Sequence, residues 1–152
     1  INPAVTAGLA SIGKINPMDA LGYIIAQFGG AITAMVLATA YVGSTFTGVP
    51  AEGVNADMVT MVAEAIGMFI FTFGIASVVF SKKPTGVNPS FVVGSSLLLG
   101  ISLAAVQSNG VLNPAVAFGI SSFNLMYLLG PIVGSVLGFN VYKMLFSKIQ
   151  NK

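Results

Sequence analysis

The tetrapeptide Asn-Pro-Ala-Val occurs twice in this chain, at Asn2–Val5 and at Asn113–Val116. Asparagine is a favoured helix N-cap, and proline suits the first helical position because it has no N–H that needs an acceptor. Each copy therefore predicts a helix start. The runs behind them, Ala4–Ile12 and Ala115–Ser122, are too short to cross a bilayer and predict half-helices of about 15 Å.

The composition is that of a membrane protein. Hydrophobic residues make up 55% of the 152-residue chain and charged residues only 7%, whereas a soluble domain carries about a quarter charged residues. A net charge of +2 from scattered lysines argues against a nucleic-acid partner. The absence of Cys and His removes common metal ligands and the usual catalytic base, so we expect neither an enzyme nor a metal or cofactor.

Four stretches are long and apolar enough to predict helices that span the lipid bilayer, for which about 20 residues are needed. They predict an all-α fold and cover Ala20–Val42, Asp57–Phe80, Pro89–Gln107 and Asn124–Phe146.

The lysines predict the orientation of these spans, because cytoplasmic loops near span ends are enriched in Lys and Arg. With four alternating spans, all six lysines fall on one side, which predicts a cytoplasmic C-terminus: Lys14, Lys82, Lys83, Lys143, Lys148 and Lys152. The first Asn-Pro-Ala-Val copy then enters the membrane from the cytoplasm and the second from outside. The two copies are therefore inverted.

The repetition extends into the spans that follow. "LGYIIAQFGGAITA" pairs with "LMYLLGPIVGSVLG", which aligns Tyr23 with Tyr127 and Gly30 with Gly134. Inverted repeats of this kind place a site at the bilayer midplane, where discontinuous helices end. We therefore predict a single domain over 1–152, in which 1–42 ends a first repeat and 57–152 forms a second.

Two half-helices that enter from opposite faces meet at their N-termini. Each N-terminus carries about half an elementary positive charge, so the meeting point repels cations. The amides of Asn2 and Asn113 cap their helices through oxygen and offer N–H groups to a neutral, oxygen-bearing solute such as water. A water held in this way interrupts a proton-conducting chain. The predicted pore residues are Asn2, Pro3, Ala4, Asn113, Pro114 and Ala115.

The motifs "INPAVTAG", "YIIAQFGGA", "AEAIGMFIFTFG" and "LNPAVAFG" occur in this order, and with them the chain resembles the aquaporin and aquaglyceroporin superfamily, the major intrinsic proteins. The resemblance implies an inverted-repeat bundle of six helices and two re-entrant half-helices. This chain would hold the last four spans, with two more upstream of Ile1. It also implies a passive channel for water or small neutral solutes such as glycerol, assembled as homotetramers in a plasma or inner cell membrane.

Departures from the family pattern concern the outer selectivity filter. Most members carry arginine where this chain has Val116, and many carry His or Gly where an ungapped comparison places Ile101; a third filter position falls on Gly110. We therefore expect a more apolar constriction, which argues against strict water selectivity. For Glu64, the acid within a span, the resemblance implies a structural role, in which it accepts hydrogen bonds from a re-entrant loop.

Other functions remain open at this stage. A coupled secondary transporter also fits inverted repeats and broken helices, but it needs several ionisable residues at the midplane, where only Glu64 is expected. An ion or proton channel is a further alternative, because Val116 removes a cationic barrier. Finally, the isolated chain would be an inactive fragment if the whole protein supplies the missing pore wall.

Overall fold

A computed structural model shows an all-helical chain over its described residues, which are 1–43, 57–81 and 88–146. It agrees with the predicted fold class. The helices are α1 (Pro3–Ser11), α2 (Pro17–Val42), α3 (Met58–Val79), α4 (Pro89–Ala104), α5 (Pro114–Gly119) and α6 (Leu125–Phe146).

Helix starts follow one local rule. In four helices an asparagine N-cap precedes a proline at the first position, and the asparagine side chain accepts a backbone N–H of the first turn; these caps are Asn2, Asn16, Asn88 and Asn113. In α3 the cap is Asp57, which accepts the N–H of Thr60. Capping of this kind satisfies donors that a helix N-terminus otherwise leaves unpaired.

Three helices, α2, α3 and α6, are long and apolar enough to cross a membrane. The third predicted span, Pro89–Gln107, is shorter than expected: α4 has 16 residues and ends at Ala104. There the backbone N–H groups of Gln107 and Ser108 both bond to the carbonyl of Ala104, which turns the chain away from the helix. The second half-helix is also shorter than predicted: it ends at Gly119, and Ser121 adopts a left-handed backbone with φ 61°.

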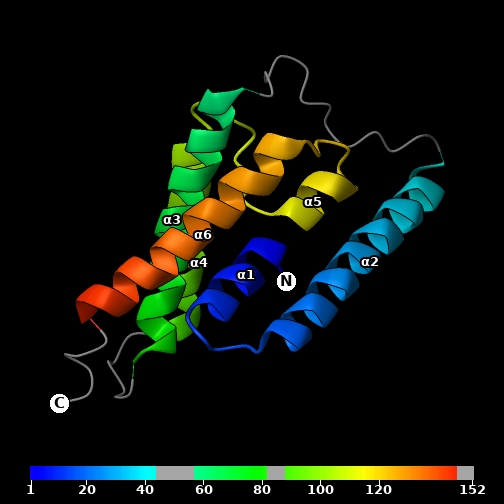
Figure 1. Cartoon of the computed structure of the whole chain (residues 1–152). Helices are drawn as coiled ribbons and strands as arrows, with labels where there is room; N and C mark the ends of the chain where they lie inside the picture. Colours follow the sequence, from blue (N-terminus) through cyan, green and yellow to red (C-terminus); the bar gives the residue numbers. More distant parts are fainter. Residues whose placement is uncertain (44–56, 82–87, 147–152) are drawn as a thin grey trace.

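Figure 1 shows α3, α4 and α6 grouped together, with α2 standing apart and the half-helices α1 and α5 between. The tightest packing joins α6 to α3, where three α6 glycines lie against α3 backbone carbonyls. A Cβ at Gly130 or Gly138 would come within 2.6 Å of a carbonyl oxygen. Small residues of this kind allow helix backbones to approach closely in membranes.

Each half-helix packs on the span of the other repeat. Gly8 of α1 lies against Ser135 of α6, and Gly119 of α5 lies against Ala31 of α2. The two glycines both stand six residues after the asparagine of their motif, and Ser135 and Ala31 both stand eight residues after their paired tyrosines. The inverted repeat seen in the sequence is therefore also a repeat of contacts.

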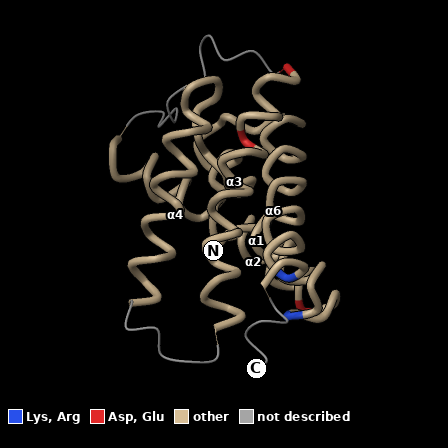
Figure 2. The backbone as a smooth tube through the Cα atoms, turned by 90° about the vertical axis from the view of Figure 1, so that its left-hand side faces the viewer, with Lys and Arg blue, Asp and Glu red and all other residues tan. Residues whose placement is uncertain are grey.

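Figure 2 shows the described lysines at one end of the bundle. Lys143 donates from Nζ to the carbonyl of Ile12 at 3.2 Å, and Lys14 lies over the ring of Phe80 at 5.0 Å. The remaining lysines of the orientation prediction, Lys82, Lys83, Lys148 and Lys152, lie outside the described residues. The sidedness of the chain stays a prediction.

Candidate functional site

The two motif asparagines cap their own half-helices through their amide oxygens. Oδ1 of Asn2 accepts the backbone N–H of Ala4 at 2.9 Å. Oδ1 of Asn113 accepts those of Ala115 at 3.1 Å and Val116 at 3.3 Å. Because the oxygen of each amide is held by its helix, the NH₂ group of each is directed away from that helix.

Each NH₂ group then bonds to the opposite motif. Nδ2 of Asn2 donates to the carbonyl of Leu112 at 2.9 Å, and Nδ2 of Asn113 donates to the carbonyl of Ile1, also at 2.9 Å. Since an amide NH₂ has two N–H donors, one N–H on each asparagine has no acceptor among the described residues. Two N–H donors therefore stay unengaged where the half-helix N-termini meet.

The proline and alanine of each motif lie behind these amides. Both prolines and both alanines are buried, at Pro3, Ala4, Pro114 and Ala115. They shape and pack the helix starts. The two asparagines differ in burial, because Asn2 is 8% exposed whereas Asn113 is half-buried and lines a pocket.

Leu112 connects the two motifs through its backbone. The residue is fully buried and adopts a left-handed φ of 54°, which costs a branched residue about 1–2 kcal/mol. Its carbonyl accepts from Asn2, and its N–H donates to Oε2 of Glu64 at 2.7 Å. Sequence reasoning missed this residue, since a left-handed leucine leaves no signal in composition or spacing.

Glu64 of α3 is fully buried and is bound by the loop that precedes Asn113. Its Oε1 accepts from Oγ of Ser108 at 2.7 Å and from the N–H of Val111 at 3.0 Å, in addition to the bond from Leu112. Nearby, the N–H of Asn109 donates to the hydroxyl of Tyr127 at 3.0 Å. The carboxyl oxygens of Glu64 thus accept three hydrogen bonds, all from one segment, so this buried polar group is not left without partners.

Two of the three filter positions expected from the resemblance are in contact. Ile101 of α4 and Gly110 lie together, since a Cβ at Gly110 would be 2.9 Å from the Ile101 carbonyl oxygen. The left-handed φ of 60° at Gly110 favours glycine. Val116, the third position, is 45% exposed and lines the pocket together with Asn113.

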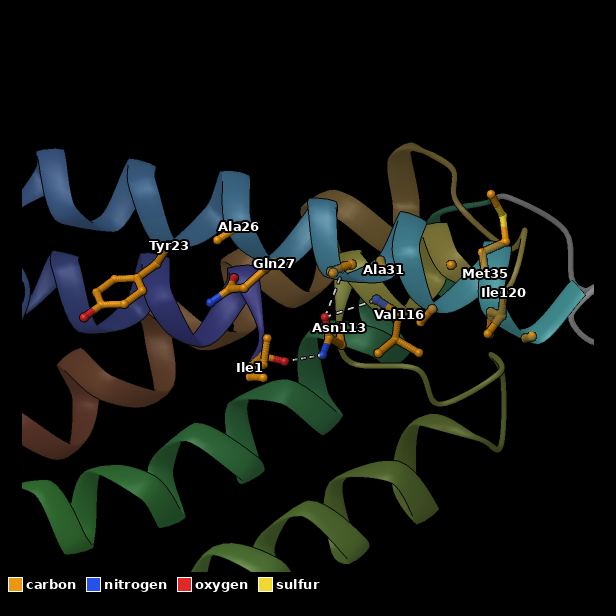
Figure 3. A pocket seen from close by; sticks show the side chains of 14 residues that line it. Ile1, Tyr23, Ala26, Gln27, Ala31, Met35, Asn113, Val116 and Ile120 are labelled. Atoms are coloured by element: carbon orange, nitrogen blue, oxygen red, sulfur yellow. Dashed lines mark hydrogen bonds between the residues drawn. The ribbon is translucent and has the colours of Figure 1, made fainter. Parts of the chain in front are cut away.

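This pocket has a volume of about 730 Å³ and lies between α2 and α5 (Figure 3). Eight α2 residues line it: Tyr23, Ala26, Gln27, Gly30, Ala31, Ala34, Met35 and Ala38. Counted from the paired tyrosines, they are the counterparts of the eight buried residues of α6: Tyr127, Gly130, Pro131, Gly134, Ser135, Gly138, Phe139 and Tyr142. The face that α6 buries against its neighbours is therefore the face that α2 leaves open.

Comparisons with known proteins agree with this geometry. The family model described as major intrinsic protein matches residues 1–142. The chain is 30% identical to Aquaporin AqpM of Methanothermobacter thermautotrophicus, over 97% of this chain and 68% of the relative. It is 31% identical to Aquaporin TIP4-4 of Zea mays, over 96% and 62%. It is 28% identical to a probable glycerol uptake facilitator protein of Thermotoga maritima, over 96% and 74%.

The chain thus spans 62–74% of the length of these three relatives. The match to the family model covers both half-helices and every described helix from α1 to the greater part of α6. Together with three helices long enough to cross a membrane, it identifies a multi-pass integral membrane protein. The chain belongs to the major intrinsic protein family.

Proposed function

We propose that the protein containing this chain is a passive transmembrane channel for water and small neutral solutes such as glycerol. The observation that carries the proposal is the reciprocal pair of hydrogen bonds between the two motifs, which leaves one N–H on Asn2 and one on Asn113. These donors lie where two positive helix ends meet, so the site favours an oxygen acceptor and opposes cations. The relatives named as aquaporins and a glycerol facilitator support this chemistry.

The filter residues extend the proposal to solutes larger than water. Ile101, Gly110 and Val116 offer apolar surface, and Val116 stands where the resemblance leads one to expect arginine, so a carbon-bearing solute meets a favourable wall. We assign Glu64 a structural role, because its hydrogen bonds to the loop leave it engaged. That engagement also argues against a coupled transporter, which needs an acid free to exchange its proton or ion. A passive channel requires no catalytic group, and we propose that the protein is not an enzyme.

We further propose that two more apolar helices cover the open face of α2 in the whole protein. The support is the correspondence between the residues that line the pocket and the buried face of α6, which α3 covers. A complete pore wall then requires those helices, and we expect the 152-residue chain alone to be inactive. The remaining features proposed from the resemblance are a homotetramer, a plasma or inner cell membrane and a cytoplasmic C-terminus.

The test is stopped-flow light scattering on proteoliposomes that contain the whole protein. Vesicles are challenged with sucrose to measure water efflux and with glycerol to measure solute entry. We expect fast shrinkage with a low activation energy, followed in glycerol by fast re-swelling. Rates equal to those of empty liposomes for both solutes would refute the channel.

The matched variant is Asn113→Asp, which replaces the N–H donors with a second oxygen at nearly constant volume. It removes the bond to Ile1 and adds negative charge at the meeting point, so we expect lower water permeability and a new cation leak. A variant that conducts water normally and excludes cations would contradict the role assigned to the asparagine pair.

A further inference from the structure

A hydrogen-bond relay connects the spanning helix α2 to the first motif. Nε2 of Gln27 donates to Oγ1 of Thr6 at 2.9 Å, and Oγ1 of Thr6 donates to the carbonyl oxygen of Asn2 at 3.1 Å. Thr6 is 5% exposed, so its bond to Asn2 is shielded from competing water, whereas its bond to Gln27 is part-buried. In Figure 3 the Gln27 side chain extends from α2 toward the start of the first half-helix, close to Ile1.

The second repeat has no such relay. The residue that corresponds to Thr6, four positions after the motif asparagine, is Ala117. The counterpart of Gln27, four positions after the paired tyrosine, is Pro131. Neither has a side chain that forms hydrogen bonds, so the relay is not a packing device common to both repeats. The second motif is bound instead by Glu64, through the loop on its other side.

The amide oxygen of Gln27 lowers the stability of the fold. Its Oε1 atom is buried and has no hydrogen-bond partner in the described part of the chain, and burial of an unpaired amide oxygen is unfavourable. The rest of the α2 wall of the pocket is almost entirely apolar, so a methionine or leucine would fill this place without that cost. The amide N–H, which reaches Thr6, is the part of the side chain that an apolar residue cannot supply.

Asn2 is consequently fixed at three atoms. Its Oδ1 is held by Ala4, its Nδ2 by Leu112, and its carbonyl oxygen by Thr6, which donates from both its backbone N–H at 3.0 Å and its hydroxyl. The direction of the unengaged Asn2 N–H depends on all three. The Leu112 carbonyl is held through Glu64 of α3, and the Thr6 hydroxyl is held through Gln27 of α2.

We propose that Gln27 is a positioning residue, which sets the first half-helix through Thr6 and thereby aims the solute-binding N–H of Asn2. The inference rests on the proposed channel function. Loss of the relay allows the start of α1 to shift, while the second motif, held by Glu64, stays in place. The two N–H donors then no longer converge on one solute oxygen.

The flux experiment compares Gln27→Met and Thr6→Val, which keep volume and remove the hydrogen bonds, with Thr6→Ser, which keeps the hydroxyl. We expect the first two to lower water permeability by up to about tenfold, the effect of one hydrogen bond on a rate. These two variants should also change the ratio of glycerol to water permeability. Thr6→Ser should keep both the water permeability and this ratio near the wild-type values. The matched control is Thr33→Val, since the Thr33 hydroxyl donates to the carbonyl of Gly29 in its own helix. If the wild-type protein conducts and Gln27→Met alters neither quantity, the inference is overturned and the channel stands.

A second measurement does not depend on flux. The 152 residues contain no cysteine, so once any cysteine elsewhere in the whole protein is replaced, Ile1→Cys and Val116→Cys can each be labelled selectively with a methanethiosulfonate reagent. We expect Gln27→Met to change the labelling rate at position 1 and to leave position 116 unchanged. An unchanged rate at position 1 overturns the inference. A wild type without water or glycerol flux refutes the channel, and in that case the labelling rates still decide the role of Gln27 in positioning the half-helix.

Discussion

Gly134 and Gly30 occupy the same place in the two repeats but have opposite surroundings. A Cβ at Gly134 would overlap the backbone of Ala65 in α3, whereas nothing lies within 4 Å of a Cβ at Gly30. The glycine at this equivalent position therefore lies in a tight helix contact in α6 but on an open pocket wall in α2.

This difference predicts opposite effects of the same substitution. Gly134→Ala forces α6 away from α3 and should lower the free energy of unfolding by about 1–3 kcal/mol. In the 152-residue chain Gly30→Ala should be neutral or stabilising by up to about 1 kcal/mol, since alanine favours a helix over glycine. Thermal unfolding in detergent measures both. Equal destabilisation of the isolated chain by both changes would show that the α2 face is already covered.

The same pair tests whether further helices cover α2 in the whole protein. If they do, a Cβ at Gly30 meets a neighbour there, and Gly30→Ala becomes destabilising by an amount similar to Gly134→Ala. The measurement is the same unfolding experiment on the longer protein. A neutral Gly30→Ala in both proteins would remove the proposed cover.

Glu64→Gln should destabilise the loop before Asn113. The amide keeps the volume of the carboxyl but turns one acceptor oxygen into a donor, so the N–H of Leu112 or Val111 loses its partner. A buried donor without a partner costs about 1–3 kcal/mol. Because the loop leads into Asn113, we also expect Asn113 to be displaced and water permeability to fall. Stability and flux are measured together. Normal stability with an altered pH dependence of transport would instead indicate a proton-carrying acid.

Val116→Arg should narrow the pocket beside Asn113 and place a positive charge on its wall. The longer cationic side chain occupies part of the pocket that Val116 now lines, so we expect glycerol permeability to fall more than water permeability. A tenfold fall in their ratio corresponds to about 1.4 kcal/mol in the barrier. Val116→Met, which adds length without charge, separates the two effects. An unchanged ratio in Val116→Arg would show that this position does not contact the solute.

The capping bond of Asp57 should make the free energy of unfolding fall in acid. The hydrogen bond from the backbone N–H of Thr60 holds the pKa of the Asp57 carboxyl below its ordinary value of 3.8. Because the folded pKa is the lower one, this carboxylate stabilises the fold above pH 3.8 and loses that contribution as the pH falls through the folded pKa. Asp57→Asn keeps the cap without the titration, so its melting temperature should vary less below pH 4. Parallel curves for both proteins would contradict the assignment.

The sequence predicted the half-helices and the spans because their signals are local. An Asn-Pro start needs no distant partner, and apolar length alone indicates a span. The ends were less predictable: α4 stops at Ala104 because the chain turns there, and Ser121 ends the second half-helix in a left-handed conformation.

The contacts of the site depend on residues far apart in the sequence. Glu64 could be recognised as an acid within a span, but its donors Val111 and Leu112 are backbone groups that no residue type identifies. Gln27 was part of a recognised motif, and its polarity within an apolar span was the available signal. Its partner Thr6 became evident only when α1 and α2 were placed side by side.

The reciprocal bonds between the motifs also have a consequence for biosynthesis. Asn2 and Leu112 are 110 positions apart, and Ile1 and Asn113 are 112 apart. Translation at about 5–20 residues per second separates their synthesis by roughly 5–20 seconds. Throughout that interval the Asn2 amide and the Ile1 carbonyl lack their acceptor and donor, and lipid cannot replace either. Hydration or the insertion machinery must hold the first motif until the second emerges, so the part of this chain made first is among the last to reach its native place.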